Sequence, residues 1–260
     1  KEESLRCKSQ SSPSKANSFV ENFFDFYVSS SQNDEKLKTY LCTPETNKFS
    51  VLKGIVYCFN TVYTVSVSES KDVSKTSLVD LSSIVKQYSD QGFVSVGFDY
   101  REQYSFRNGS ESENERTKAK DVLLSDAKLF IEKSEHTLKQ LFSSKGLDQS
   151  FLQNKFLFGL GFGSLMSIEL SLLNPQQYKG LILVSPFIEE DQGLTLESNF
   201  IIVVPGLDST VNPLSQVHFF EKCRSKNKEI VYIDNCGSEL VYTNEFKEVN
   251  EGIIYWMKRR

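Results

Sequence analysis

The chain has 260 residues, of which 39% are hydrophobic, 12% aromatic and 25% charged, and its formal net charge is −4. This length and aromatic content suit one sizeable hydrophobic core and exclude global disorder. The mildly acidic balance gives no reason to expect nucleic acid or an anionic membrane as a partner, and no apolar run reaches the length of a transmembrane segment.

The first seventeen residues differ in composition from the rest of the chain. They place four basic residues around a Ser-Ser-Pro-Ser run and contain no apolar core, which is typical of a flexible tail. We therefore expect a tail at 1–17 and a single domain at 18–260. The first residue is Lys1 rather than Met, which indicates a processed or truncated chain.

Apolar segments that suit strands alternate with segments of helical spacing along the rest of the chain. The expected strands cover 19–27, 36–41, 54–60, 93–98, 155–158, 180–184, 200–204 and 229–234. The expected helices cover 78–88, 115–142, 165–173, 213–226 and 245–258. The first two strands suit an antiparallel pair, and the alternation after them predicts an α/β fold with a doubly wound, mostly parallel sheet.

The most informative segment is a strand, a glycine-rich turn and a helix around Gly161. Its outline is G-x-S-x-G, the turn in which a catalytic serine sits between a buried strand and a helix, but Gly161 stands where the serine would be. Glycine has no atom that attacks a carbonyl, yet it adopts positive φ easily. The same glycines suit a phosphate-binding loop, but the next strand ends in Ser185-Pro186 where a ribose-binding acid would be expected. The sequence thus predicts a bend at Gly161 with φ above zero.

The run FGLGFGSLMSIELSLLNPQQYKGLILVSP (158–186) resembles the corresponding region of α/β hydrolases, and best the branch of monoacylglycerol lipases and serine aminopeptidases. Segment 93–101 is similar to the D-x-R-G region of that family, although 102–104 lacks its glycines. The resemblance extends from Phe19 onward and is close only around Gly161. It implies an α/β-hydrolase fold with a reduced cap, because only 187–199 separates the two strands that normally flank a helical lid.

The resemblance also implies where catalytic groups would lie. In the turn 206–211 the family's acid falls on Asp208 or on Ser209, depending on where one residue is deleted. Ser238 stands where the family has its histidine base, so no imidazole is available there to take a serine proton. The degenerate positions are Gly161, Asp208, Ser209 and Ser238, and the vestigial oxyanion region comprises Asn60, Thr61 and Phe162.

The joint loss of nucleophile, base and oxyanion glycine predicts a chain that is not an enzyme, with no catalytic residues, no cofactor and no metal. We expect such a hydrolase-like chain to act as a structural or accessory subunit in contact with other protein subunits. Two alternatives remain open. One is a serine hydrolase of esterase or lipase type with rearranged groups, using Ser164 or Cys236 with His218. The other is a small-molecule binding protein.

Three smaller features complete the prediction. The cap remnant carries three consecutive acidic residues (189–191), which suit a solvated loop or a docking surface for a basic partner. His136 is expected to be exposed on the long helix, and His218 to be partly buried on a later helix. Five scattered cysteines without C-x-x-C spacing indicate free thiols, which favour a reducing compartment or an organelle interior over secretion. They are Cys7, Cys42, Cys58, Cys223 and Cys236.

Overall fold

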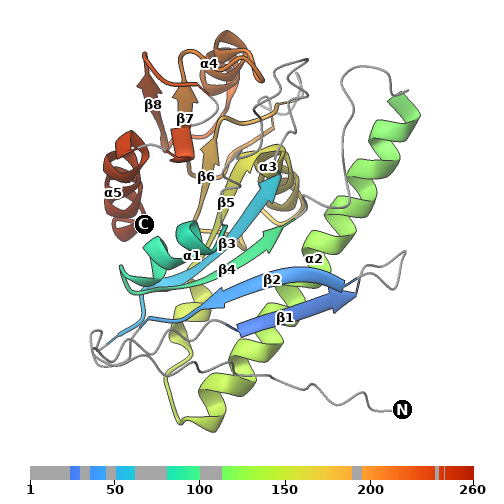
Figure 1. Ribbon diagram of the computed structural model, residues 1–260, viewed down its shortest axis with the longest axis vertical. Coiled ribbons are helices and arrows are strands. Elements are labelled where there is room, and N and C mark those ends of the chain that lie inside the picture. Colours follow the sequence, from blue (N-terminus) through green and yellow to red (C-terminus); the bar gives the residue numbers. More distant parts are fainter. Residues whose placement is uncertain are drawn as a thin grey trace, which may run out of the picture.

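A computed structural model describes residues 24–29, 36–44, 51–61, 81–99, 113–188, 195–237, 240–242 and 244–260. It confirms the predicted α/β architecture (Figure 1). The predicted tail at 1–17 lies outside the described residues, as do the acidic residues 189–191.

Every predicted strand and helix is present, with ends that differ by a few residues. The strands are β1 (Phe24–Ser29), β2 (Lys36–Cys42), β3 (Gly54–Thr61), β4 (Phe93–Asp99), β5 (Lys155–Gly161), β6 (Gly180–Val184), β7 (Phe200–Pro205) and β8 (Lys228–Ile233). The helices are α1 (Leu81–Ser89), α2 (Glu113–Ser144), α3 (Phe162–Leu173), α4 (Pro213–Lys222) and α5 (Asn244–Lys258), with 3-10 turns η1 (Ser150–Gln153) and η3 (Leu240–Tyr242).

Two boundaries differ for clear physical reasons. Strand β5 runs to Gly161 rather than to Phe158, because its parallel pairing with β3 continues as far as the Thr61 and Gly161 pair. Helix α4 ends four residues earlier than expected. Its last carbonyls are taken up by the Lys228 ammonium, which donates to the carbonyl of Cys223 at 2.8 Å and to two carbonyls just before it.

The eight strands form one sheet in the order β1-β2-β4-β3-β5-β6-β7-β8. Strands β1, β2 and β4 pair antiparallel, and all pairs from β4 to β8 are parallel. Strand order reverses between β3 and β5, since β4 lies outside β3. The carboxyl ends of β3, β5, β6 and β7 therefore share one edge next to a topological switch point, where open α/β sheets place their ligands.

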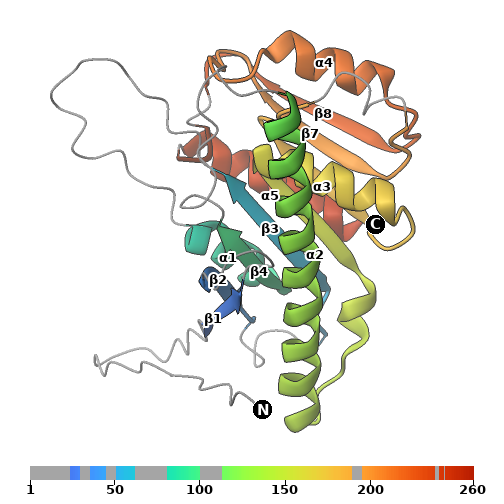
Figure 2. The same ribbon diagram turned by 90° about the vertical axis from the view of Figure 1, so that its right-hand side faces the viewer.

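Helices cover both faces of the sheet (Figures 1 and 2). On the face covered by α2, α3 and α4, Phe130 of α2 packs against Phe59 and Phe98, with ring centroids 5.9 and 4.7 Å apart. On the face covered by α1 and α5, Tyr88 packs on Phe158 of the central strand β5. Both cores are aromatic-rich, which accounts for much of the high phenylalanine content.

Polar contacts fix the long helix α2 to its neighbours. The Lys155 ammonium of β5 lies 2.6 Å from a Glu135 carboxylate oxygen, which also accepts a hydrogen bond from the Tyr57 hydroxyl at 3.2 Å. Burial, together with the Glu135 charge, raises the pKa of Tyr57 well above its usual value. Nearer the amino-terminal end of α2, the Lys120 ammonium pairs with the Glu169 carboxylate of α3 at 2.8 Å.

The cysteines of the described chain carry free, buried thiols, as the sequence indicated. Burial raises the pKa of Cys58 far above its usual value and that of Cys223 to about 12. Both thiols are thus protonated and chemically quiet at neutral pH. In the same described ranges, no helix is both long and apolar enough to cross a membrane.

Two glycines allow α3 to lie directly against the sheet. A Cβ on Gly163 would lie 2.2 Å from the Phe59 carbonyl oxygen of β3, and one on Gly159 would lie 2.4 Å from the Cα of Ser164. Neither position tolerates a side chain, because the clashing atoms belong to the backbone. The first turn of α3 is therefore seated on the sheet at van der Waals distance.

Replacing Gly163 by alanine is expected to lower the free energy of unfolding by about 1–3 kcal/mol, since backbone must move to admit the methyl group. The control is Gly252→Ala in α5, where an added Cβ meets nothing within 4 Å. That change is expected to stabilise the protein by about 0.5–1 kcal/mol through helix propensity. Urea unfolding followed by circular dichroism measures both values, and equal effects at the two sites would contradict the packing described.

Candidate active site

The bend between β5 and α3 has the geometry that the glycine-rich turn predicts. Gly161 has φ 57° and ψ −119°, and it directly precedes the first residue of α3. Its neighbour across the sheet is Thr61, at the carboxyl end of β3. This places the bend at the edge of the sheet where strand order reverses, with the positive end of the α3 dipole beside it.

The residue after β6, Ser185, lies next to this bend. The N–H of Ser185 donates to the carbonyl of Val203 at 2.9 Å, and two residues on, Phe187 donates its N–H to the carbonyl of Gly161 at 3.1 Å. Ser185 is buried and has φ 45°, and among the described residues it is the one non-glycine with positive φ. Such a conformation costs free energy and recurs at functional sites.

The side chain of Ser185 is directed at a carboxylate. Its hydroxyl donates to Oδ2 of Asp208, a buried residue in the turn after β7. The other oxygen, Oδ1, accepts the N–H groups of Thr210 at 2.8 Å and Val211 at 3.0 Å. These three hydrogen bonds hold the Asp208 carboxyl group in one orientation.

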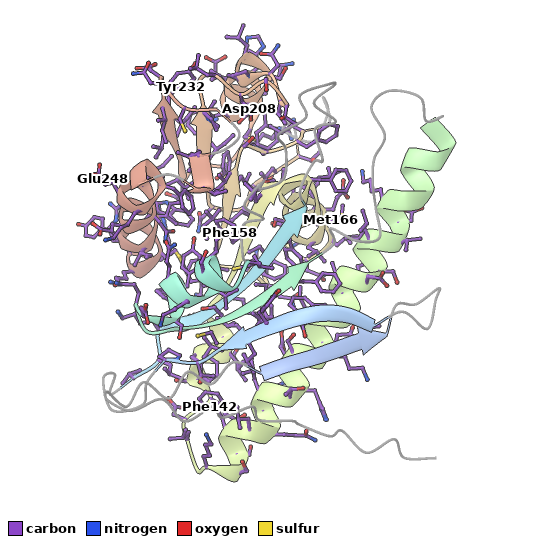
Figure 3. All side chains as sticks on the ribbon, viewed as in Figure 1. Phe142, Phe158, Met166, Asp208, Tyr232 and Glu248 are labelled. Atoms are coloured by element: carbon purple, nitrogen blue, oxygen red, sulfur yellow. The ribbon has the colours of Figure 1, made fainter. Side chains whose placement is uncertain are left out.

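Helix α4 anchors the Asp208 turn through residues of its first turns. The Asn212 side chain caps α4 by accepting the N–H of Leu214 at 2.9 Å, and Pro213 occupies the first helical turn. Gln216 is fully buried, and its amide donates to the carbonyl of Val211 at 3.2 Å. The turn is therefore bonded at both of its ends, and its position relative to β6 is fixed. Figure 3 shows Asp208 at the end of the molecule where β7 and β8 terminate.

Together these residues form a hydroxyl, a carboxylate and a group that orients the carboxylate. A nucleophile in hydrogen-bond contact with a base that is itself oriented by a third group is the arrangement that activates serine in covalent catalysis. Among the described residues, no cluster of three or more histidine, cysteine or acidic side chains is placed to hold a metal ion.

The structure places the predicted positions as follows. Asn60 and Thr61 end β3 beside the bend, and the buried ring of Phe162 begins α3 at 5.8 Å from the Phe187 ring. Of the two acid candidates, Asp208 is buried and bonded whereas Ser209 is exposed. Ser238 lies outside the described residues.

The groups considered as substitutes for the missing triad are not brought together. The hydroxyl of Ser164 is fully buried and donates to the Gly159 carbonyl at 2.7 Å, behind the bend. Cys236 is buried in the core beneath α5. His218 is exposed on α4, not partly buried as predicted, because it faces away from the Phe219 side of that helix. His136 is exposed on α2, as predicted.

Sequence reasoning recognised Ser185-Pro186 as the end of a strand and gave Ser185 no role. A usable signal was present, since Ser185 directly follows a buried parallel strand and Asp208 follows the next one. Because the carboxyl ends of adjacent parallel strands lie at one edge of the sheet, proximity of the Ser185 and Asp208 side chains could have been predicted.

Comparison with known proteins identifies the fold. No protein-family model matches the chain, and no curated protein matches its sequence. Solved structures do match. An esterase of Pyrococcus furiosus, Pf2001, is 13% identical with a TM-score of 0.60, over 98% of this chain and 99% of its own. A cold-adapted esterase from an Arctic intertidal metagenomic library is 11% identical with a TM-score of 0.59, over 96% and 99%. A monoacylglycerol lipase of Paleococcus ferrophilus is 11% identical with a TM-score of 0.53, over 86% and 99%.

The chain thus has the α/β-hydrolase fold, as the glycine-rich region implied. The prediction that the chain is not an enzyme is wrong, because the structures that it matches are those of esterases and a lipase. That prediction assumed that a chain with glycine at position 161, where the family has its serine, has no catalytic activity.

Asp208→Ala is expected to lower the free energy of unfolding by about 2–3 kcal/mol, because two turn N–H groups and a buried hydroxyl lose their acceptor. Asp208→Asn is expected to cost less than about 1.5 kcal/mol, since the amide oxygen still accepts both N–H groups. Chemical denaturation measures the difference. Equal losses for the two variants would show that the turn bonds do not hold the carboxylate.

Proposed function

We propose that this chain is a serine esterase in which the catalytic pair lies one strand away from the usual elbow. Ser185 is the nucleophile and Asp208 its general base. The observation that carries the proposal is the hydrogen bond from the buried Ser185 hydroxyl to Oδ2 of Asp208. The esterase and lipase identities of the matching structures support the same class of reaction.

The pair supplies the steps of ester hydrolysis. Ser185 Oγ attacks the acyl carbon while its proton passes to Asp208 Oδ2, and the alkoxy oxygen then leaves with that proton. A water molecule attacks the acyl-serine ester and gives a proton to Asp208. Collapse of the second intermediate releases the carboxylic acid and returns the proton to Ser185 Oγ. Bonds and protons balance over the cycle without a further reagent.

Three features of the surroundings favour this role. Burial lowers the effective dielectric constant around the Ser185 and Asp208 contact and strengthens its electrostatics. The N–H groups of Thr210 and Val211 prevent the carboxylate from rotating away. Helix α3 begins directly after Gly161, whose carbonyl accepts the N–H of Phe187 in the segment after Ser185. The dipole of α3 favours negative charge near this end, as on a tetrahedral intermediate.

Gly161 fits this arrangement because it keeps the bend, with φ 57°, without adding a side chain there. A carboxylate is a weaker base than an imidazole at neutral pH, so the proposed reaction is best suited to carboxylic esters rather than to peptide bonds.

A binding protein for small esters or acids is a second candidate, and it is favoured by one observation: the bend is retained while its nucleophile position is a glycine. Such a protein would bind the same ligands and leave them unchanged. The two candidates therefore differ in turnover and not in affinity.

Ser185→Ala and Asp208→Asn are each expected to lower kcat/KM for p-nitrophenyl acetate by about 10²–10⁴-fold, because each removes one half of the proton-transfer pair. A fluorophosphonate probe is expected to label the unmodified protein on Ser185, as located by peptide mass spectrometry. Ser164→Ala serves as the matched control, since its buried hydroxyl bonds only within the bend, and it should keep both turnover and labelling.

Labelling of any other serine, or full activity in Ser185→Ala, would refute the assignment. Ligand binding without turnover in the unmodified protein would favour the binding candidate instead.

The pH profile provides an independent test of the base. Enzymes that use a histidine base lose activity as the imidazole is protonated near pH 6.5. With a carboxylate in place of a histidine as the base, no fall in kcat/KM centred near pH 6.5 is expected. A fall with an apparent pKa near 6.5 would instead implicate His136 or His218, and the corresponding His→Gln variants would identify which one.

A further inference from the structure

Strand β8 ends the sheet and presents an apolar face to solvent. It pairs with β7 on one side, and no described strand pairs with its other side. Its side chains alternate between two environments. Val231 and Ile233 pack beneath α5, whereas Ile230 and Tyr232 point to the opposite face and are 37% and 48% exposed. An apolar edge strand of this kind is a template for pairing with another strand.

The outward backbone groups of β8 belong to its even-numbered residues, which include the two exposed residues. The carbonyl of Asn227 accepts from Phe200, and that of Ile233 accepts from Gly206, so odd-numbered residues of β8 direct their backbone toward β7. In a parallel pair the direction alternates along the strand. Ile230 and Tyr232 therefore direct their N–H and C=O groups away from the sheet, and no hydrogen bond within the described chain uses them.

The exposed area continues onto the end of β7. Leu207 is 65% exposed, and its N–H donates to the carbonyl of Cys236 in the loop that follows β8. The hydroxyl of Tyr232 lies close to neighbouring Gly206, where an added Cβ would be 3.0 Å from it. Leu207, Ile230 and Tyr232 thus form one patch, called here the edge patch, at the end of the molecule where Figure 3 labels Tyr232.

We propose that the edge patch is the contact for a second copy of this chain, with the two β8 strands paired antiparallel about a two-fold axis at Val231. In this register Ile230 of one copy lies opposite Tyr232 of the other, and both pairs exchange backbone hydrogen bonds. Aromatic and β-branched residues are favourable cross-strand neighbours. The two sheets become one sheet of sixteen strands with no exposed β8 edge.

The charges at the two ends of β8 complement one another in this arrangement. Near its start, Arg259 and Arg260 of α5 both pair with Glu229, at 3.3 and 3.4 Å, which leaves a net positive charge. Near its end stands the exposed Asp234. Antiparallel pairing brings the positive end of one strand to the negative end of the other, and does so twice. Parallel pairing would set like charges side by side, so the charges select a second copy in the antiparallel sense.

Sedimentation velocity of the full chain over a range of concentrations tests the proposal. We expect a reversible dimer, and we expect Tyr232→Lys to raise its dissociation constant at least tenfold by placing two ammonium groups in the pairing. Leu147→Lys is the control, because Leu147 is also an exposed hydrophobic residue, at 37%, and it lies beyond the far end of α2. The control should leave the dimer unchanged, and circular dichroism should show that both variants are folded.

A cysteine at the axis tests the register. Opposed residues of a non-hydrogen-bonded pair have Cα atoms about 4.5 Å apart, within the range of a disulfide. Val231→Cys is therefore expected to give a 231-to-231 disulfide under mild oxidation, identified by peptide mass spectrometry. Ile230→Cys should not crosslink to itself, since its partner across the axis is residue 232. A chain that stays monomeric at all concentrations, a dimer unaffected by Tyr232→Lys, or crosslinking of Ile230→Cys in place of Val231→Cys would each overturn the proposal.

Discussion

The direct seating of α3 on the central strands is the constraint on which the rest of the molecule depends. Gly163 meets the Phe59 carbonyl and Gly159 meets the backbone of Ser164, with no side chain between them. This contact sets the height of the helix above the sheet and so fixes the bend at Gly161. The segment after β6 is bonded to that bend through Phe187, and it carries Ser185. The position of the candidate nucleophile therefore depends on two glycines in other elements, Gly159 of β5 and Gly163 of α3.

The proposed pair of Ser185 and Asp208 lies at the same edge of the sheet as the bend at Gly161. The carboxyl ends of β5, β6 and β7 are neighbours in the parallel sheet, a few ångströms apart from strand to strand. In the proposed enzyme, a hydroxyl directly after β6 and a carboxylate in the turn after β7 take the place of a nucleophile at the end of β5. Burial and the turn bonds to Asp208 then supply the fixed orientation that a histidine and its acid supply elsewhere.

Much of the fold was predictable from the sequence, because hydrophobic periodicity and the Gly and Pro residues that end helices and strands are local signals. The run 180–184 is apolar throughout and is buried throughout as β6, and Asn174-Pro175 ends α3 where expected. The positive φ of Gly161 followed from its motif. The hydrogen bond between Ser185 and Asp208 did not, since it depends on strand order and on a turn held by α4. The end of α4 was also missed, because it is set by Lys228 from the following strand. Contacts of this kind join segments that no local pattern connects.

The buried cysteines lie in or beside different parts of the sheet, so their reactivity can report local unfolding of each part. Cys42 lies on β2, Cys58 on β3, Cys223 at the end of α4 and Cys236 after β8, and all four are buried. A thiol reagent reaches each sulfur only when the segment above it opens, so the rate of modification at each site reports the free energy of that opening. Cys42 reports on the antiparallel edge of the sheet and Cys58 on its centre. Cys223 and Cys236 report on the opposite edge, near β7 and β8. Thiol modification can therefore show which edge of the sheet unfolds more readily, without introducing new cysteines.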